Sequence, residues 1–478
     1  MRARFALYQP ASVDLRMKCR LYPNWHIEHS NRHFLGKAEG VTIKTLPVVL
    51  LPSYSLTEVQ MTVDASQPQG CPVAHDFDPL GADYLSDPYR PLESLRAESP
   101  VHYVPSLGYW LVTRYADIAG VFADRETFSE RIAQEPLAPL SEEARQILTE
   151  GVRNTPVLTN FGAPGHTRVR LRLARPFLPR RVEQLRPLIE KRAEELIDKF
   201  ASNGSADLVE ALTFPLPALT VFGLIGFPAE DADQLKSWCD NKLEVNWGRP
   251  SPEYQQRAAS NMSLFWDYCE RFVATRLSDQ ADDLTSELIR QRETDEDALD
   301  DREITSVIFA LSFAGHETTT NLIGNTLRQL LSRPELLLAI QADPSVIDRA
   351  VEETLRFDSS VVAWRRVTTK PTTIGGVDVP EGAKLMLSLA SANRDPEQFT
   401  DPETFDIGRK NSRTHLSFGK GAHFCMGQHL ARVEARIVIE MLVSRLPGLR
   451  LSDEQQWSFP PNISFRGPKK LQVEWDAN

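Results

Sequence analysis

The sequence predicts a mainly α-helical fold with a minor antiparallel β part, and three observations support this prediction. Apolar residues recur at helical spacing through most of 180–300, as Leu185, Leu188 and Ile189 illustrate. The segment 302–332 is strongly apolar over its first turns, which is typical of a helix buried at the centre of a large fold. Two short apolar runs, 101–104 and 109–113, flank a Pro-Ser-Leu-Gly turn and predict a β-hairpin.

The composition is that of a globular protein. Of the 478 residues, 41% are hydrophobic and 25% are charged, which disfavours a disordered chain and a coiled-coil rod. Lys and Arg number 54 against 65 Asp and Glu, a net charge of −11, which argues against a protein that coats nucleic acid. No run approaches the roughly 18–20 apolar residues that span a bilayer. We therefore expect neither a membrane nor a nucleic-acid partner.

The cysteines indicate a reducing compartment. There are five, an odd number without a CxxC pair, which predicts neither a disulfide framework nor a zinc ribbon. Structural disulfides are rare in reducing compartments, so we expect a cytoplasmic protein.

Residues 1–60 differ from the rest of the chain. They hold eight Lys/Arg and four Asp/Glu and show neither helical nor strand periodicity, and Met61 then opens a fresh segment. We expect an atypical N-terminal extension over 1–60, either disordered or an artefact of the assigned start site. An Arg-rich targeting presequence is the alternative. The folded domain is expected over 61–478.

The remaining elements follow in order. The acid-rich stretch 277–303 predicts a solvated loop, and the helix at 302–332 carries Gly315 and three consecutive threonines in its interior. Such a breach of helix propensity inside a buried helix favours a functional role. Helices are expected near 344–357 and 427–445, a strand-and-turn region at 365–390, and a loop-rich stretch at 393–424.

A glycine-rich loop with one thiol is the strongest motif. Phe418-Gly-Lys-Gly-Ala-His-Phe-Cys-Met-Gly427 places Cys425 just before a predicted helix. A helix start carries positive partial charge, which favours a thiolate, and backbone N–H groups aimed at the sulfur would tune its basicity. Taken alone, a lone cysteine in a loop is more often a buried structural residue.

This loop resembles the haem-thiolate loop of the cytochrome P450 family, F-x-x-G-x-(R/H)-x-C-x-G, at every defined position. The chain is similar to that family over 75–476, most of all to its soluble bacterial type. The resemblance implies a triangular, helix-rich single domain with haem b between a long central helix and the cysteine loop. It also implies that Cys425 ligates the iron and that Phe418, Gly419 and Gly427 shape the haem-binding loop.

Further motifs match the same family. Glu353 and Arg356 resemble its E-x-x-R pair and Arg409 the third partner, a set that the resemblance makes structural rather than catalytic. The residues implied to bind the haem propionates are His166, Arg170, Arg366 and His423. An i,i+3 ion pair and a lone solvated arginine are commonplace by themselves. The segment before His166, Phe161-Gly-Ala-Pro, departs from the acidic, proline-rich turn of many relatives.

The central helix carries a match to the family's oxygen-activating segment, Ala314-Gly-His-Glu-Thr318. Ala314 and Thr318 are four residues apart and therefore share a helix face. The resemblance implies that Ala314 leaves room beside the haem and that Glu317 and Thr318 are catalytic and relay protons. A threonine can instead donate to the carbonyl four residues earlier. His316 lies off this face and is given no role.

Family position also implies a substrate pocket that is mostly apolar, which favours a small hydrophobic substrate. Its expected lining residues are Ala310, Phe313, Ala314, Val361, Val362 and Ala363, with Pro461 and Asn462 near its roof. The segments that begin at Cys71 and Ile132 look similar to the bacterial branch that degrades thiocarbamate herbicides.

The function implied is that of a monooxygenase that inserts one atom of O2 into an organic substrate by hydroxylation or dealkylation. Only about 50 residues follow Cys425, so we expect electrons from a separate ferredoxin and its NAD(P)H-dependent reductase. Arginines around 168–181, with Lys420 and Arg432, predict a basic docking face, although they could equally be scattered solvated charges. A peroxygenase, a haem sensor and a helical protein without haem are the alternatives. The Glu317–Thr318 pair and the cysteine loop disfavour them.

Overall fold

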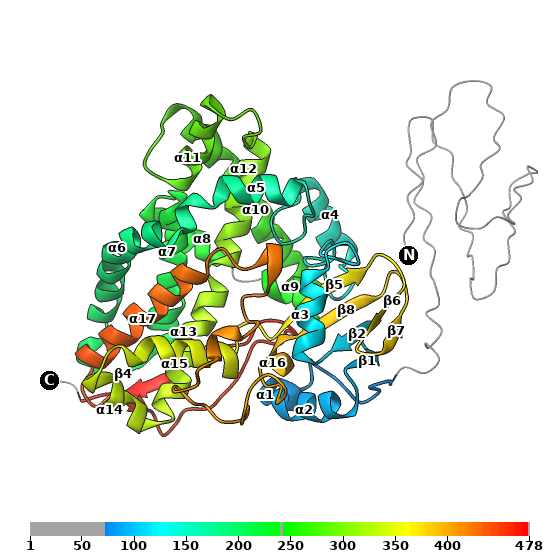
Figure 1. Ribbon diagram of the computed structural model, residues 1–478. Helices are drawn as coiled ribbons and strands as arrows, with labels where there is room; N and C mark the ends of the chain where they lie inside the picture. The colour runs from blue at the N-terminus through cyan, green and yellow to red at the C-terminus, as the bar shows by residue number, and fades with distance from the viewer. Residues whose placement is uncertain (1–71, 240–241, 477–478) are drawn as a thin grey trace, which may run out of the picture. The chain divides into compact units, whose positions relative to one another are not determined.

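The computed structural model describes residues 72–478, apart from 240–241 and 477–478. The expected extension 1–60, and the expected domain start at Met61, lie outside the described residues. Within 72–478, helices α6, α7, α13, α15 and α17 lie on one side and the sheet that contains β1, β2, β8 and β5 lies on the other (Figure 1). The prediction of a mainly α-helical fold with a small β part is confirmed.

The helices of the described residues are α1 Ala82–Ser86, α2 Tyr89–Glu98, α3 Tyr115–Ala123, α4 Glu142–Gly151, α5 Gly165–Leu173, α6 Pro179–Asp198, α7 Pro215–Ile225, α8 Ala232–Cys239, α9 Lys242–Trp247, α10 Pro252–Ser278, α11 Leu284–Arg290, α12 Asp301–Ala314, α13 Glu317–Leu331, α14 Pro334–Ala342, α15 Val346–Phe357, α16 Leu389–Ala392 and α17 Gln428–Arg445. The last two long helices, α15 and α17, match the expected 344–357 and 427–445.

The strands are β1 Val101–Val104, β2 Tyr109–Val112, β3 Phe128–Ser129, β4 Ser205–Asp207, β5 Ala363–Thr368, β6 Thr372–Ile374, β7 Val377–Val379, β8 Lys384–Ser388, β9 Arg450–Leu451 and β10 Gln472–Glu474. They form a five-stranded sheet in the order β1-β2-β8-β5-β3, a three-stranded sheet β4-β10-β9 and the hairpin β6-β7. Most pairs are antiparallel, but β2 pairs with β8 in parallel.

The predicted hairpin is present. Strand β1 pairs antiparallel with β2 in a register that sets Val101 opposite Val112 and Val104 opposite Tyr109. Gly108 closes the turn at a φ of 68°, a conformation that few side chains tolerate. All four residues of β2 are buried, because the strand lies inside the sheet between β1 and β8.

The central helix is broken, which corrects the prediction of one helix over 302–332. Helix α12 ends at Ala314 and α13 begins at Glu317. A Cβ on Gly315 would lie 3.1 Å from a methyl of Val221 in α7, so the absence of a side chain lets the two helices approach closely. The break therefore coincides with the segment that the sequence singled out.

The acid-rich stretch 277–303 is not simply a solvated loop. It contains α11, whose Leu284, Leu288 and Ile289 are buried against neighbouring helices. Asp283 caps this helix by accepting from the N–H of Ser286. The charges in the stretch mask a short amphipathic helix, which is why composition alone suggested a loop.

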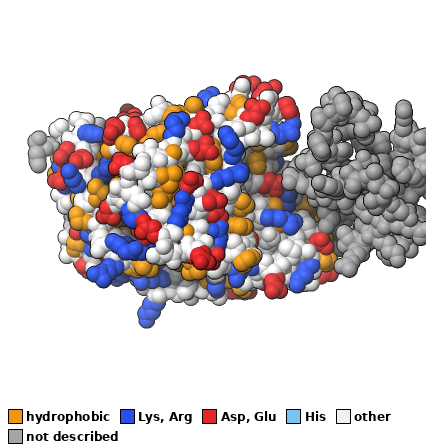
Figure 2. Space-filling model, turned by 90° about the horizontal axis from the view of Figure 1, so that it is seen from above, with side chains coloured by type: hydrophobic (Ala, Val, Ile, Leu, Met, Phe, Trp, Pro, Cys, Tyr) orange, Lys and Arg blue, Asp and Glu red, His pale blue; other side chains and the backbone are white. Residues whose placement is uncertain are grey.

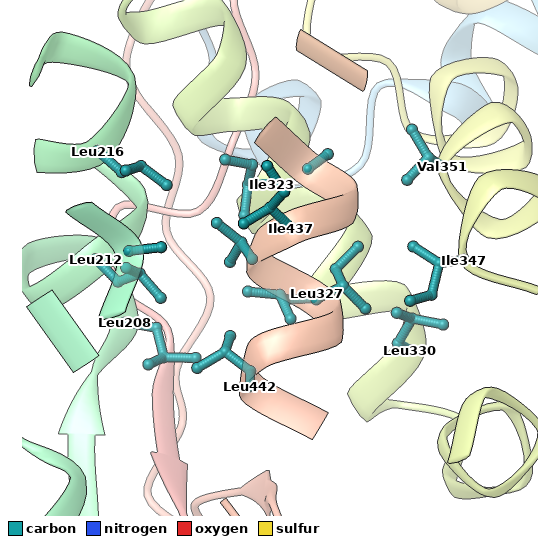
Figure 3. Packing of buried hydrophobic residues seen from close by; sticks show 14 of the residues in the cluster. Leu208, Leu212, Leu216, Ile323, Leu327, Leu330, Ile347, Val351, Ile437 and Leu442 are labelled. Carbon is teal, nitrogen blue, oxygen red and sulfur yellow. The ribbon is translucent and has the colours of Figure 1, made fainter. Parts of the chain in front are cut away.

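The largest hydrophobic cluster surrounds α17 (Figure 3). Ile437 and Leu442 of α17 lie among apolar side chains of α13, of α15 and of the segment 208–216. Labelled members from those three elements are Leu208, Leu212, Leu216, Ile323, Leu327, Leu330, Ile347 and Val351. This packing fixes the helix that follows Cys425 and so holds the cysteine loop against the body of the protein.

Candidate active site

The cysteine loop runs into the N-terminus of α17. The backbone N–H of Cys425 donates to the carbonyl of Phe418 at 3.0 Å, which closes the loop on itself. Gly421 has a φ of 73°, and a Cβ there would lie 3.0 Å from the carbonyl oxygen of Phe122. Glycine at this position therefore lets the loop pass close to the end of α3. Gly427 caps α17.

Two opposing effects act on the pKa of the Cys425 thiol. Burial raises the pKa of the thiol, while the backbone N–H groups of Gly427 and Gln428 and the cations Arg170 and Arg432 lower it. The residue is partly exposed, unlike the other described cysteines, Cys239 and Cys269, which are buried. A thiolate at a helix N-terminus is suited to bind a metal as a strongly donating ligand.

Ala314 and Thr318 lie at the break between α12 and α13. Ala314 is exposed although its neighbour Phe313 is only 4% exposed, so the helix presents a small side chain to open space at this point. The Thr318 hydroxyl donates to the carbonyl of Ala314 at 2.8 Å. This is the back-bond considered from the sequence, and it leaves the lone pairs of the hydroxyl oxygen available to a further donor.

Glu317 and His316 flank this point differently. Glu317 is partly exposed at the first position of α13, and its charge acts on Tyr254 of α10. His316 is buried, with its Nε2 3.1 Å from the carbonyl oxygen of Phe214 and its ring 4.4 Å from that phenyl ring. The histidine packs into the core, away from the face that Ala314 and Thr318 share.

Buried cationic and imidazole side chains gather beside the cysteine loop. The rings of His166 and His423 lie 4.1 Å apart, and neither ring nitrogen of His166 has a hydrogen-bond partner. His423 Nδ1 contacts the carbonyl of Leu158 at 2.9 Å, but its Nε2 is unpartnered. Burial lowers the pKa of each histidine to about 4.

Two arginines complete this cluster. Arg366 is 3% exposed, packs over the ring of Phe122 and donates to the carbonyl of Arg365, and it has no carboxylate partner within ion-pair distance among the described residues. Arg170 donates to the carbonyl of Phe424 at 2.7 Å. Four of the predicted propionate-binding residues are thus brought to the cysteine loop from α5, β5 and the loop itself.

Glu130 belongs to the same cluster and was missed by the sequence analysis. One of its carboxylate oxygens lies 3.8 Å from Nε2 of His423, and the residue is 5% exposed. Glu130 directly follows β3, and only the pairing of β3 with β5 carries it to this place. No motif in the sequence marks it.

These residues fit a haem. The unpartnered ring nitrogens of His166 and His423, and the buried guanidinium of Arg366 without an ion-pair partner among the described residues, are groups that two buried propionates require. A single thiol at a helix N-terminus suits an axial iron ligand. Ala314 is exposed between the buried Phe313 and the partly exposed Gly315, which leaves room for a flat ligand beside the helix. No cluster of three or more metal-binding side chains occurs in the described part of the chain.

The predicted E-x-x-R pair is fully buried. Arg356 donates to both carboxylate oxygens of Glu353, at 2.6 and 3.0 Å, and to the carbonyls of Asn393, Pro402 and Thr404. Arg409 reaches the same carboxylate at 3.1 Å. The set therefore ties α15 to the loop that leads into the cysteine motif.

The residues expected to line the substrate pocket differ in their exposure. Ala310 and Val361 are partly exposed, whereas Val362 and Ala363 are buried at the start of β5. Phe313 packs between the rings of Phe265 and Phe309, at 5.7 and 5.0 Å, so the structure places it in an aromatic core.

The two expected roof residues also differ. Asn462 is 4% exposed, and its side-chain oxygen accepts from the N–H groups of Ser464 and Phe465. Pro461 is exposed.

Most arginines of the expected basic face are already paired. Arg168 bonds to Glu303, Arg172 lies 2.8 Å from Asp295, and Arg432 bonds to Glu352. On the face shown in Figure 2, basic and acidic side chains are interspersed. A continuous basic face is therefore not formed there, because acidic side chains of the segment 287–303 pair with arginines of α5.

Comparison with known proteins defines the class. A sequence description of the family "Cytochrome P450" matches residues 252–475. The chain is 37% identical over 413 residues to cytochrome P450 monooxygenase PikC of Streptomyces venezuelae, with 84% of this chain and 95% of that protein covered. The chain belongs to the cytochrome P450 family.

Solved structures of cytochromes P450 also resemble this chain. Cytochrome P450 CREJ, in complex with (4-ethylphenyl) dihydrogen phosphate, is 39% identical with a TM-score of 0.81, and the match covers 84% of this chain and 100% of CREJ. An intact type IV self-sufficient cytochrome P450 monooxygenase is 40% identical with a TM-score of 0.82, over 86% of this chain and 54% of that one. The chain is thus an oxidoreductase of the monooxygenase class with a haem cofactor. Across the described residues, no helix has the length and hydrophobicity of a membrane span.

Proposed function

We propose that the protein inserts one atom of O2 into a small hydrophobic organic substrate, by hydroxylation or dealkylation, with haem b as cofactor. The observation that carries the proposal is the meeting of the half-buried Cys425 thiol with the unpartnered ring nitrogens of His166 and His423 and with the buried Arg366, which forms no ion pair with a described residue. The solved relative CREJ holds a small alkylphenyl compound, which supports a small organic substrate.

Each site residue then has a defined task. Cys425 would supply the thiolate that ligates the haem iron, within a loop shaped by Phe418, Gly419 and Gly427. The residues that would hold the propionates are His166, Arg170, Arg366 and His423. When bound, the haem supplies oxygen activation, and a thiolate ligand favours cleavage of the O–O bond.

The remaining residues surround the substrate and transfer protons. Ala314 leaves space at the helix break, and the apolar start of β5 at Val361, Val362 and Ala363 excludes water from the substrate. The Thr318 hydroxyl is fixed by its bond to the Ala314 carbonyl, so its oxygen can accept a proton-donating water, and Glu317 feeds protons to it from the direction of α10.

The direct test is the absorption spectrum of the dithionite-reduced, haem-loaded protein with CO, in which thiolate ligation gives a strongly red-shifted band. Turnover with O2, a ferredoxin, its reductase and NAD(P)H should then oxidise a small apolar compound. A band at the position typical of imidazole ligation would overturn the ligand assignment. Turnover that requires added peroxide and ignores the electron donors would make the protein a peroxygenase.

Thr318→Ala should separate oxygen consumption from product formation. Without the hydroxyl, proton delivery is no longer directed, so more of the electrons from NAD(P)H should leave as hydrogen peroxide. Substrate affinity should change by less than about twofold, since one hydroxyl next to an apolar ligand adds little uniform binding. NAD(P)H, peroxide and product are measured together.

Thr320→Ala is the matched control, because the Thr320 hydroxyl makes the same kind of back-bond, to the carbonyl of His316 at 3.2 Å. This variant should keep electron use and product formation coupled. Equal coupling in Thr318→Ala and the parent would remove Thr318 from the proton path.

We further propose a ferredoxin and its NAD(P)H-dependent reductase as electron donors, in a cytoplasmic setting. Docking rests on few charges, because Arg168, Arg172 and Arg432 are already paired, whereas Lys420 in the cysteine loop is exposed. The approach of an acidic partner should therefore depend on Lys420.

Lys420→Glu should slow reduction by a [2Fe–2S] ferredoxin about threefold or more at low salt, with substrate affinity unchanged. Stopped-flow traces of haem reduction at several salt concentrations measure this. The control is Lys469→Glu, which changes an exposed lysine just before β10, and the haem of this variant should be reduced at the parent rate. Equal rates for all three proteins would place the docking site elsewhere.

A further inference from the structure

A buried arginine without an ion-pair partner among the described residues lies next to the candidate active site, and the nearest carboxylate whose charge acts on it is that of Glu135. Arg365 of β5 is 0% exposed, and its guanidinium stacks on the indole of Trp247 with 3.7 Å between Cζ and the ring centroid. It donates to the carbonyl of Ala133 at 3.1 Å and reaches the hydroxyl of Tyr109 only at 3.5 Å. Its Nε has no partner.

Three other arginines with an unpartnered buried nitrogen have a carboxylate nearby, whereas Arg192, like Arg365, forms no ion pair with a described residue. Arg172 lies 2.8 Å from Asp295, Arg276 lies 2.8 Å from Asp283, and Arg466 lies 3.7 Å from Asp358. For Arg365, no ion pair occurs with any described residue. Burying a guanidinium charge without an anion is costly, so this arrangement indicates an acidic group supplied from outside the chain.

The stacked partner lacks an acceptor as well. Trp247 at the end of α9 is 0% exposed, and its indole Nε1 has no hydrogen-bond partner. Two touching side chains with orphaned donors also occur at His166 and His423, where the haem propionates are the expected acceptors. The same reasoning applied to Arg365 and Trp247 points to a second acceptor at this place.

That acceptor is not a haem propionate. Consecutive residues of a strand point to opposite faces, so Arg365 and Arg366 diverge, and Arg366 lies over Phe122 on the side of the cysteine loop. Trp247 instead belongs to the hydrophobic cluster that contains Val362 and Ala363, two of the expected pocket residues. The unmatched donors therefore adjoin the expected substrate pocket.

We propose that Arg365 and the indole N–H of Trp247 bind the oxyanion of an acidic substrate, a carboxylate or a phosphate monoester, at the end remote from the oxidised carbon. The inference rests on the proposed function and narrows its substrate class. Arg365 and Trp247 are both 0% exposed, so the proposal requires α9, which carries Trp247, to move away from β5 when the acidic group binds. A guanidinium offers an oxyanion paired N–H donors.

The test is isothermal titration calorimetry of the full-length, haem-loaded protein with octanoate, octyl phosphate and octan-1-ol, which share one tail. We expect at least one acid to bind about tenfold tighter than the alcohol, as a charge-assisted hydrogen bond would give. Which acid binds more tightly distinguishes carboxylate from phosphate. Equal affinity for all three compounds would overturn the proposal.

Three variants locate the effect. Arg365→Gln should remove the preference for the acid and leave octan-1-ol binding within about twofold, while Trp247→Phe keeps the ring and should weaken only the acid, by about threefold. The control is Arg180→Gln, which changes an exposed arginine at the start of α6 and should bind the acids and the alcohol as tightly as the parent does. If Trp247→Phe weakens the binding of acid and alcohol equally, then Arg365 and Trp247 form only a packing contact. This outcome can be read even if Arg365→Gln fails to fold.

The binding heats do not depend on turnover. A protein that prefers the acid but lacks the red-shifted CO band would contradict the proposed function and retain the oxyanion site. A protein with that band but no preference for the acid would contradict only the site.

Discussion

Replacing Cys425 by serine is expected to abolish monooxygenase turnover and the red-shifted band of the reduced, CO-bound protein. The hydroxyl stays protonated at neutral pH and is a much weaker electron donor than a thiolate. The fold should survive, because Phe418 still accepts from the backbone N–H at this position and α17 is fixed by its own cluster. Product assays, the CO spectrum and circular dichroism are measured on one preparation.

Cys269→Ser is the control for this substitution. Cys269 is 0% exposed in α10, so its replacement should lower stability somewhat through the buried hydroxyl while the CO spectrum and turnover stay as in the parent. A red-shifted band retained by Cys425→Ser would show that another group ligates the iron.

Glu353→Gln is expected to lower the free energy of unfolding by about 3–5 kcal/mol, the usual cost of breaking a buried ion pair. Arg356 is 0% exposed and would keep its charge without a carboxylate, and Arg409 would lose its ion-pair partner too. Because this set holds the loop before the cysteine motif, haem retention should fall together with stability. Urea titration followed by absorbance and circular dichroism measures both.

The chain offers a control with the same spacing. Glu183 and Arg186 form an i,i+3 pair on α6 at 2.8 Å, but the Glu183 side chain is 54% exposed. Glu183→Gln should therefore cost less than about 1 kcal/mol. Similar losses for Glu353→Gln and Glu183→Gln would mean that burial does not set the strength of the E-x-x-R pair.

The sequence predicted the class of protein well because its signals are local. The cysteine motif, the E-x-x-R pair and the Ala314–Thr318 segment each occupy a few neighbouring residues, so spacing alone identifies them. The mainly α fold followed in the same way from helical periodicity. Both predictions are confirmed, the first by the family comparison and the second by the structure.

Predictions that depended on composition were weaker. The acid-rich stretch 277–303 contains α11, and its acids pair with Arg168 and Arg172, so the expected basic face is largely neutralised. Charge counts cannot anticipate this, because a salt bridge between distant segments depends on how they pack. The prediction of one continuous helix over 302–332 was also wrong, because the helix is interrupted between Ala314 and Glu317, where α7 packs close to Gly315.

The sequence by itself thus determined the family, and it predicts the thiol that would bind iron and the residues of the oxygen-activating segment. Only the tertiary structure decided which polar groups are left without partners. Glu130 reaches His423 through the pairing of β3 with β5, and Arg365 meets Trp247 where α9 packs on that same strand. The physical reason is that the cost of burying a charge depends on what the fold places around it, and these neighbours lie more than 100 positions away in the sequence.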